Sequence, residues 1–403
     1  MGLIGSAGNR GAAVRSDCWI EIEIRESGGI DIVLKSKVEL LFGEDIRRQL
    51  TDLCQTYGLE NVKIVMEDSG ALPFTIAARF ESVLSKIKPD MKPQSLNVRK
   101  ENRIEKARDA FRRSRLYLPG DQPKMMINAG IHSPDGIILD LEDSVAPAKK
   151  DDARFLVRRA LEQVDFYGAE RMVRINQLPL GLKDLEAVIP AGVNLILIPK
   201  VESAAQVQEL AHAITKIQAE HSLSAPVWLM PIIESALGVI KAYEIAAAAP
   251  EIVALAIGLE DYTADLGTAR TDSGQESLFA RSMIVNAARA AGLQPIDSVF
   301  SDVADMEALA KNVALSKSLG FDGMGCIHPR QIPVIHEGYA PADSDIEKAK
   351  KIVLAFDEAQ AKGLGVVSLG SKMIDPPVVK RALRTIDLAI CSQKLAHDWK
   401  EAK

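Results

Sequence analysis

Charged side chains follow a series of short apolar segments from about residue 116 onward. Six of these segments end in polar groups, namely D-L-E-D-S at Asp140, R-I-N at Arg174, P-K-V-E at Pro199, E-S at Glu234, E-D at Glu260 and H-P at His328. Carboxylates without a cluster of His or Cys suit a hard cation such as Mg²⁺. Glu234 and Asp261 are the candidate metal ligands. An arginine beside such a site can hold a substrate carboxylate or stabilise a developing enolate oxygen, and Arg174 is the candidate.

Eight apolar segments that alternate with helix-like stretches could position these residues. The expected strands are 116–118, 136–141, 172–175, 195–198, 227–233, 253–257, 295–299 and 323–327. Near-continuous apolar strands indicate burial on both faces, as in a parallel sheet. Eight such units over about 230 residues predict an α/β fold, a (β/α)8 TIM barrel over residues 112–342, whose reaction face lies at the carboxyl ends of the strands. No G-x-G-x-x-G or P-loop motif indicates a nucleotide-binding fold.

Other interpretations of the same residues remain open. The charged groups could form an ion-pair layer that closes one end of the barrel. Lys200 is the nearest candidate for a Schiff-base lysine, although Glu202 allows an ordinary salt bridge. No G-x-S-x-G motif supports a serine hydrolase. His328 precedes a proline, so a structural hydrogen bond to neighbouring backbone is as consistent with its position as a part in the reaction.

The rest of the chain divides into four segments. We expect a flexible N-terminus over residues 1–14, a small α+β domain over 15–85, a basic linker and surface helix over 86–111, and a helical tail over 343–403. In the small domain, 19–24 and 30–34 resemble a hairpin, 38–57 a helix, and 62–66 and 74–78 further strands. Residues 86–115 hold eleven Lys or Arg and four Asp or Glu, a net charge of +7, typical of a solvated linker or a cationic lip for phosphates.

Composition excludes several protein classes. The 403 residues carry a net charge of −6, with 47% hydrophobic and 26% charged residues, as in soluble globular proteins. The four cysteines have no C-x-x-C spacing, so they indicate neither a zinc site nor a disulfide framework, and fit reduced thiols in the cytoplasm. No export signal or membrane-spanning run is visible. We therefore expect a cytoplasmic protein without a nucleic-acid or membrane partner.

The motifs of the expected barrel resemble a known family. R-S-R-L-Y-L-P-G at Arg113, D-L-E-D-S-V-A-P-A-K-K-D-D-A-R at Asp140, V-R-I-N, P-K-V-E, I-E-S-A-L-G, G-L-E-D-Y-T-A-D-L-G and G-C-I-H-P-R-Q-I are similar to those of the citrate lyase β subunit and its citramalyl- and malyl-CoA lyase relatives, the HpcH/HpaI aldolase family. The resemblance spans residues 112 to 342 without a missing block. It implies a Mg²⁺-dependent barrel that cleaves or forms a C–C bond between an α-keto acid and an acyl thioester enolate.

The resemblance also implies roles for individual residues. Glu234 and Asp261 would be metal ligands, and Glu142 and Arg174 would surround the keto-acid substrate and act in the reaction. Arg113 would lie near the substrate or its thioester carrier. The implied activity is retro-Claisen cleavage of a citryl-like thioester to an α-keto acid and an acyl thioester.

The N-terminal domain is similar to the γ subunit of citrate lyase, an acyl carrier protein. The similarity rests on F-G-E-D-I-R at Phe42, E-D-S-G-A-L at Glu67 and I-A-A-R at Ile76. In that family a Ser in a Ser-x-Asp motif carries a CoA-derived prosthetic arm. The ungapped match places Arg15 at this position, so either Ser16 carries the arm or the domain is a docking or oligomerisation module and the barrel uses free CoA thioesters.

Several functional alternatives remain after the resemblance. The barrel could be a citramalyl- or malyl-CoA lyase or a thioester synthase, and a non-catalytic carrier or assembly protein is the alternative of another class. The expected partners are a small-molecule hydroxyacyl thioester or keto acid, further copies of the chain in a trimer or hexamer, and an acyl-transferase subunit like citrate lyase α.

Overall fold

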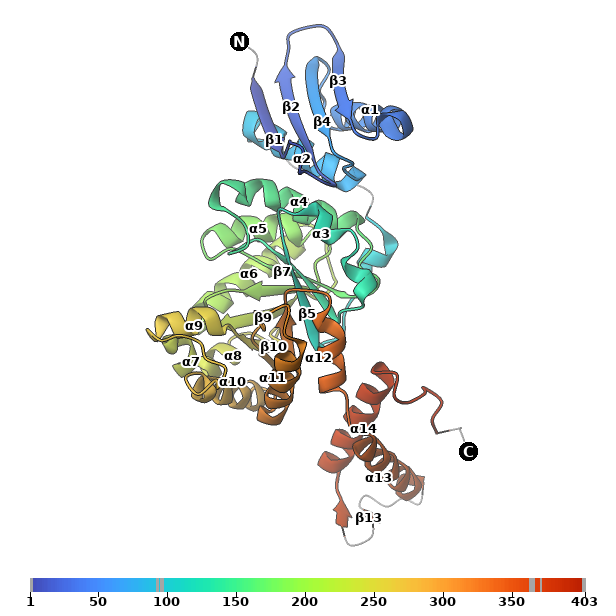
Figure 1. The fold of residues 1–403 in the computed structure, drawn as a ribbon, viewed down its shortest axis with the longest axis vertical. Helices are drawn as coiled ribbons and strands as arrows, with labels where there is room; N and C mark the ends of the chain where they lie inside the picture. The colour runs from blue at the N-terminus through green and yellow to red at the C-terminus, as the bar shows by residue number, and fades with distance from the viewer. Residues whose placement is uncertain (1–2, 92–93, 95–97, 362–366, 370–371, 401–403) are drawn as a thin grey trace.

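The chain folds into an N-terminal domain, a central barrel and a C-terminal helical segment (Figure 1). A computed structural model describes residues 3–91, 94, 98–361, 367–369 and 372–400. The expected segments 1–14, 86–111 and 343–403 therefore each lie partly outside the described residues. Among the described residues, no helix is both long and apolar enough to cross a membrane.

Eight parallel strands close the central barrel, as predicted. They are β5 (Ser114–Pro119), β6 (Gly136–Asp140), β7 (Glu170–Arg174), β8 (Leu195–Ile198), β9 (Trp228–Ile233), β10 (Ala254–Ile257), β11 (Gln294–Asp297) and β12 (Gly323–Cys326). Each strand pairs with the next in chain order, and β12 pairs with β5 to complete the ring. The prediction of a (β/α)8 barrel is confirmed, and all carboxyl ends meet on one face.

Helices surround the barrel on the outside. They are α3 (Pro123–Met126), α4 (Lys150–Gln163), α5 (Leu180–Val188), α6 (Ala204–Glu220), α7 (Ala236–Ile240), α8 (Ala242–Ala246), α9 (Leu259–Asp265), α10 (Leu278–Ala290), α11 (Met306–Leu319) and α12 (Gln331–Tyr339). Short 3-10 turns η2 (Ala129–His132) and η3 (Pro147–Lys149) lie in the loops after β5 and β6.

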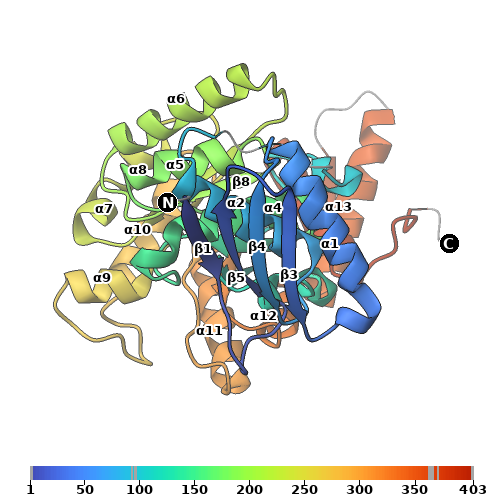
Figure 2. The same ribbon diagram turned by 90° about the horizontal axis from the view of Figure 1, so that it is seen from above.

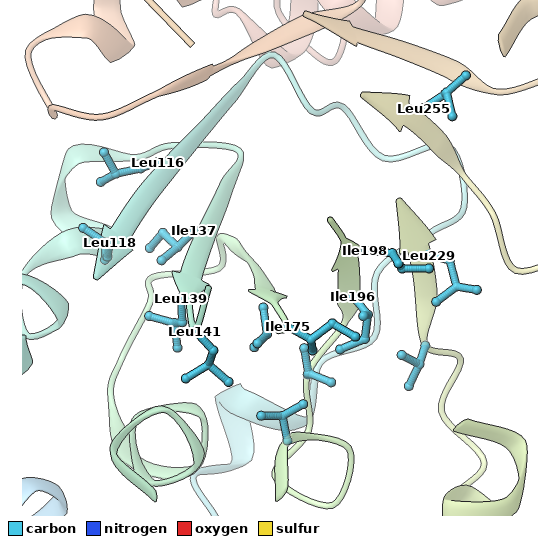
Figure 3. Close-up of a cluster of buried hydrophobic side chains, with 14 of the residues drawn as sticks. Leu116, Leu118, Ile137, Leu139, Leu141, Ile175, Ile196, Ile198, Leu229 and Leu255 are labelled. Atoms are coloured by element: carbon cyan, nitrogen blue, oxygen red, sulfur yellow. The ribbon is translucent and has the colours of Figure 1, made fainter. Parts of the chain in front are cut away.

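Alternate strand residues build two separate cores. Outward-facing side chains such as Leu139 and Ile196 pack between the strands and the helices (Figure 3). Inward-facing side chains such as Ile138 and Leu197 fill the barrel interior. Both faces of each strand are thus apolar because both are buried, which is why these segments have near-continuous apolar sequences.

The N-terminal domain is a four-stranded sheet with two helices. Its elements are β1 (Ile4–Gly8), β2 (Cys18–Ile24), β3 (Ile30–Ser36), α1 (Glu39–Thr56), β4 (Val62–Asp68) and α2 (Pro73–Ile87), with strand order β1-β2-β4-β3. Three expectations were wrong. The strands β2 and β3 form no hairpin, because β4 lies between them, antiparallel to β2 and parallel to β3. Residues 74–78 belong to helix α2, which begins at Pro73, and residues 4–8 of the expected flexible N-terminus pair with β2.

The described part of the basic connector follows the barrel surface rather than forming a solvated linker. Its helical content is the short 3-10 helix η1 (Lys100–Arg103). Asn102 is buried and donates hydrogen bonds from Nδ2 to the carbonyls of Leu161 and Val164. Just after the connector, Arg112 forms a bidentate, fully buried ion pair with Glu170 at 2.7–2.8 Å. Within the connector, Arg99 pairs with Asp165, and Arg108 donates to the carbonyls of Pro250 and Ile252.

Helix α2 packs the N-terminal domain on helix α4 of the barrel (Figure 2). Glu81 from α2 accepts hydrogen bonds from Arg159 of α4 and from the Tyr57 hydroxyl. Arg159 also pairs with Glu162, and all three charged side chains are buried. A buried network of this kind fixes the position of the domain, because separation would leave unpaired charges in an apolar interface.

Replacing Arg159 with Met is expected to destabilise the protein by about 3–5 kcal/mol, because the buried Glu81 and Glu162 would lose their closest partner and keep only the longer pairs with Arg158, at 3.6 Å. Thermal unfolding measures the effect as a fall in Tm of several degrees. The control is Arg289→Met, which removes a half-exposed pair with Asp322 and should cost about 1 kcal/mol or less. Equal shifts in the two variants would contradict a buried, domain-fixing network.

The C-terminal segment forms a helical pair with its own small core. It comprises α13 (Asp343–Ala361), the short strands β13 (Val367–Leu369) and β14 (Lys372–Ile374), and α14 (Pro376–Cys391). Apolar residues of both helices pack together, among them Val353 and Ile386, and the buried Trp399 after α14 joins them. The pair lies on the opposite side of the barrel from the N-terminal domain (Figure 1).

Candidate active site

A cavity of about 660 Å³ opens at the carboxyl ends of the barrel strands. This volume is typical of small-molecule sites. Its floor and walls come from β5, β9 and β10, and residues of α3 and η2 border it. Its polar lining includes Arg115, Tyr117, Asp140, Asp143, Arg174, Glu234, Glu260, Asp261, Asp297 and His328.

Arg174 ends β7 and is held by a carboxylate from the adjacent strand. Its Nε and Nη2 donate to the two carboxylate oxygens of Asp140, each at 2.7 Å. Its guanidinium also lies 5.4 Å from the ring centre of Tyr117. Burial alone would raise the pKa of Asp140, but the hydrogen bonds from Arg174 hold that pKa below its ordinary value. Asp140 therefore fixes the guanidinium in one orientation at the cavity wall.

Glu142 lies just beyond β6, within reach of both cations of the site. Its Oε2 is 3.0 Å from Arg174 Nη1, and its Oε1 accepts a hydrogen bond from Gln177 at 3.1 Å. Lys200 Nζ lies 3.8 Å from the same carboxylate. Burial raises the pKa of Glu142, with Arg174 opposing the shift. The side chain is a buried carboxylate whose charge depends on its cationic neighbours.

Glu234 follows β9 and is buried against the backbone of β10. A Cβ on Gly258 would come within 2.5 Å of Glu234 Oε1, so only glycine leaves room for this carboxylate. Its Oε2 accepts a hydrogen bond from the Lys200 backbone amide at 3.0 Å. Burial, with the charges of Glu142 and Asp261, raises the pKa of Glu234 to about 7. The Glu234 carboxylate therefore has too little positive charge around it to balance its own charge.

Asp261 lies in the first turn of α9 and is the most exposed of the predicted ligands. Its side chain is 44% exposed, and its Oδ1 lies 3.5 Å from Lys200 Nζ. Lys200 has a left-handed backbone conformation, with φ of 50°, which is uncommon outside glycine and asparagine. Its ammonium lies among the carboxylates of Glu142, Asp143 and Asp261.

The donor set fits a hard divalent cation. Five carboxylates, those of Asp140, Glu142, Asp143, Glu234 and Asp261, face the positive charges of Arg174 and Lys200. Within the described residues, no group of three His, Cys, Asp or Glu side chains forms a complete metal cage. A site with two protein carboxylates and open positions is typical of Mg²⁺, which keeps waters and substrate oxygens as ligands.

Sequence comparison identifies the family of the barrel. The family model described as HpcH/HpaI aldolase/citrate lyase matches residues 113–329. The chain is 44% identical over 286 residues to the citrate lyase subunit beta of Leuconostoc mesenteroides subsp. cremoris, covering 70% of this chain and 94% of that protein. The chain belongs to the HpcH/HpaI aldolase/citrate lyase family. Human mitochondrial citramalyl-CoA lyase is a further relative, 33% identical over 290 residues, or 69% of this chain and 85% of that protein.

A solved structure from the same family resembles the barrel. It is the crystal structure of the protein CitE from Mycobacterium tuberculosis in complex with magnesium, acetoacetate and coenzyme A. The TM-score is 0.55 at 33% identity, covering 70% of this chain and 99% of that one. Residues 8–87 match a second family model, Malonate decarboxylase delta subunit (MdcD), of the acyl carrier protein type. The expected family, its carbon–carbon lyase class and the carrier-like N-terminal domain are therefore confirmed.

The structure brings together most, but not all, of the predicted site residues of this family member. Arg174, Glu234 and Asp261 line the cavity, and Glu142 lies beside it, 3.0 Å from Arg174. Arg113 does not. It precedes β5 at the amino-terminal end of the barrel, where its guanidinium pairs with Asp135 at 2.8 Å and contacts Ser392 of the C-terminal segment. The prediction for Arg113 was wrong because a residue before a barrel strand lies at the end opposite the reaction face.

The structure also shows the hydrogen-bond partners of His328 and Ser16, two further residues singled out from the sequence. His328 lines the cavity, and its Nδ1 accepts a hydrogen bond from the Arg330 backbone amide at 3.2 Å, the structural bond anticipated for it. Ser16 lies in the loop after β1, with a left-handed φ of 56°, and its amide donates to the Ser69 carbonyl. Arg15 beside it is exposed and donates to the carbonyls of Ala12 and Val14.

Sequence reasoning missed three residues of the site. Asp140 was one of several strand-end acids, and only its contact with Arg174 distinguishes it. Lys200 was considered as a nucleophile or a local salt bridge, whereas its partners come from the loop after β6 and from helix α9. Arg115 shares the inward face of β5 with Tyr117, since the two are two positions apart along the strand. This spacing was the sequence signal that could have identified Arg115 as a residue of the barrel interior.

Replacing Lys200 with Met should tighten Mg²⁺ binding roughly tenfold, because the ammonium beside Asp261 repels a second cation. Isothermal titration calorimetry of the metal-free protein measures this. Lys149→Met is the control, because Lys149 lies 4.0 Å from Asp121 at the edge of the site and has no contact with Asp261. Weaker Mg²⁺ binding in the Lys200 variant would show instead that the ammonium supports the metal site.

Proposed function

We propose that the protein is a Mg²⁺-dependent lyase that cleaves a 3-hydroxy-3-carboxyacyl thioester of the citryl type to an α-keto acid and an acyl thioester. The observation that carries this proposal is the convergence of Glu142, Glu234 and Asp261 with Arg174 at the carboxyl end of a barrel of this family. The complexes of the M. tuberculosis relative with magnesium and acetoacetate, and with magnesium and pyruvate, support it.

Glu234 and Asp261 would hold the cation, with substrate oxygens and water completing the coordination. A bound divalent cation supplies charge that lowers the pKa of a chelated hydroxyl and polarises a carbonyl oxygen. The surroundings of Glu234 support this assignment, because its carboxylate is buried and has too little positive charge around it to balance its own charge.

The residues of the chain then direct the bond cleavage. The hydroxyl proton leaves, a C=O bond forms at that carbon, and the C–C bond breaks with its electron pair on the acyl thioester, which becomes an enolate. Arg174, pre-oriented by Asp140, stabilises negative charge on the keto acid or the enolate oxygen. A proton then adds to the enolate carbon. Glu142 helps to position Arg174 through the 3.0 Å ion pair.

A free CoA thioester is the second candidate substrate, favoured by the N-terminal domain. Arg15 occupies the position where the carrier family has its modified serine, and an arginine cannot form the phosphodiester. The buried network around Arg159 also fixes this domain on the barrel. Intact mass spectrometry distinguishes the two forms: an added CoA-derived mass on Ser16 supports a carrier, and the bare polypeptide mass supports free thioesters.

A panel of thioesters tests the proposed activity. Purified protein with Mg²⁺ is mixed separately with citryl-, citramalyl- and malyl-CoA, and keto acid release is followed with a coupled dehydrogenase. Release from at least one thioester is expected. Mg²⁺ binding without turnover on any member would favour the non-catalytic assembly protein instead.

A further inference from the structure

Arg115 is a buried arginine inside the barrel. It lies on the inward face of β5 and is 1% exposed. Its guanidinium crosses the interior to the opposite side of the barrel, where Nη1 lies 3.0 Å from the Met230 sulfur on β9 and Nη2 lies 3.4 Å from the Asp297 carbonyl on β11. The residue also lines the cavity, together with Ile232 and the strand-end carboxylates.

The guanidinium has few partners for its five N–H groups. A thioether sulfur is a weak acceptor and 3.4 Å is a long hydrogen bond. Nε has no partner among the described residues, and none of their carboxylates forms an ion pair with Arg115. The nearby Asp297 carboxylate is bound by Arg281 instead.

An arrangement of this kind is costly for the folded protein. Barrel interiors are normally filled with apolar side chains, and apolar residues such as Ile138 and Leu197 form the interior cluster here. An unpaired buried charge destabilises a protein by several kcal/mol. Burial lowers the pKa of Arg115 for the same reason. Arg112, which is also buried, and Arg174 have carboxylate partners, and the buried Arg171 donates to the Gly192 carbonyl at 2.8–3.0 Å.

We propose that Arg115 forms an anion-binding subsite at the floor of the cavity, and that its ligand is a carboxylate of the acyl substrate. A carboxylate would accept two parallel hydrogen bonds from the planar guanidinium and complete its pairing. The subsite is separate from the strand-end cluster of Glu142, Glu234 and Asp261.

Tyr117 connects the two ends of the cavity. It is two residues from Arg115 on the same face of β5, and its ring lies 5.4 Å from the Arg174 guanidinium. A substrate with two anionic groups would thus be held at Arg174 and at Arg115, with the reacting carbons between them. This substrate assignment rests on the proposed function, but anion binding at Arg115 does not.

Binding of simple carboxylates to the metal-free protein tests the subsite directly. Isothermal titration calorimetry with succinate, in EDTA, should give binding that weakens at least tenfold in Arg115→Met and less in Arg115→Lys, which keeps the charge. Acetate should bind more weakly than succinate, because it reaches one subsite. Unchanged succinate affinity in Arg115→Met would overturn the proposal, as would displacement of succinate by equimolar chloride.

The thermal stability of Arg115→Met provides a second readout, which distinguishes a ligand-binding arginine from a structural one. Without ligand, Arg115→Met should unfold at the same or a higher temperature than the parent protein, because an unpaired charge is removed next to Met230. The matched control is Arg171→Met, a buried arginine outside the cavity whose guanidinium donates to the Gly192 carbonyl; it should lose stability and keep its succinate affinity. A large fall in Tm for Arg115→Met with unchanged affinity would identify a structural role only.

The enzymatic readout separates this inference from the proposed function. If the thioester panel shows turnover, Arg115→Met should lose kcat/KM mainly on substrates with a second carboxylate, by about 10- to 100-fold more than on those without it. If no thioester is cleaved, the proposed function fails, whereas the succinate titration still decides whether Arg115 binds an anion.

Discussion

Replacing Glu234 with Gln is expected to lower Mg²⁺ affinity more than tenfold and kcat/KM for thioester cleavage by about a thousandfold. The amide keeps the shape of the side chain beside Gly258 and its hydrogen bond from the Lys200 amide, but it removes the charge that a cation needs. Because the carboxylate is buried near Glu142 and Asp261, its neutralisation should leave Tm unchanged or raise it.

Calorimetry, kinetics and thermal unfolding of Glu234→Gln together distinguish a metal ligand from a structural acid. Glu202→Gln is the control, because Glu202 follows the neighbouring strand β8 and accepts a hydrogen bond from Ser235. It should retain Mg²⁺ binding. Asp261→Asn should behave like Glu234→Gln. Full Mg²⁺ affinity in the Glu234 variant would remove this residue from the metal site.

Replacing Arg174 with Lys should lower kcat/KM by about 100- to 1000-fold with a smaller change in KM. Lysine keeps the positive charge, but it cannot make the two parallel hydrogen bonds to Asp140 that fix the guanidinium. We therefore expect the variant to lose transition-state stabilisation. This loss is measured as a lower kcat with the thioester that the panel identifies.

Arg281→Lys is a closely matched control for this variant. Arg281 makes a similar buried ion pair with Asp297. Asp297 lines the same cavity, whereas Arg281 does not. Both lysine variants should lose similar stability. Similar losses of kcat/KM in the two variants would mean that the Arg174 effect is structural.

The barrel could be predicted because its strands repeat one pattern. Most are short, largely apolar segments, and six of the eight expected strands end in polar groups. Arg174, Glu234 and Asp261 were selected by that position. The N-terminal domain was harder, because the pairing of its strands depends on segments that are distant in the sequence. A turn at Gly28 and Gly29 suggested a hairpin, but β4, with its alternately buried residues, is the strand that both β2 and β3 pair with.

Helix α2 and the arginines show two further limits of sequence reasoning. The five residues from Phe74 are apolar enough for a strand, and Pro73 at the first helical position was the signal of a helix start. Arg113 and Arg115 are two positions apart in the same motif, yet Arg113 pairs with Asp135 at the amino-terminal end and Arg115 crosses the interior. Composition does not distinguish them, because the direction of the strand and its inward face decide their surroundings.

Product stoichiometry is the most direct test of the proposed reaction. The purified protein is incubated with Mg²⁺ and the thioester from the panel that reacts, and both keto acid and acyl-CoA are quantified by mass spectrometry. The account predicts equal amounts of the two products, loss of the reaction in EDTA, and recovery when Mg²⁺ is restored. Release of free CoA without keto acid, or an undiminished rate in EDTA, would contradict it.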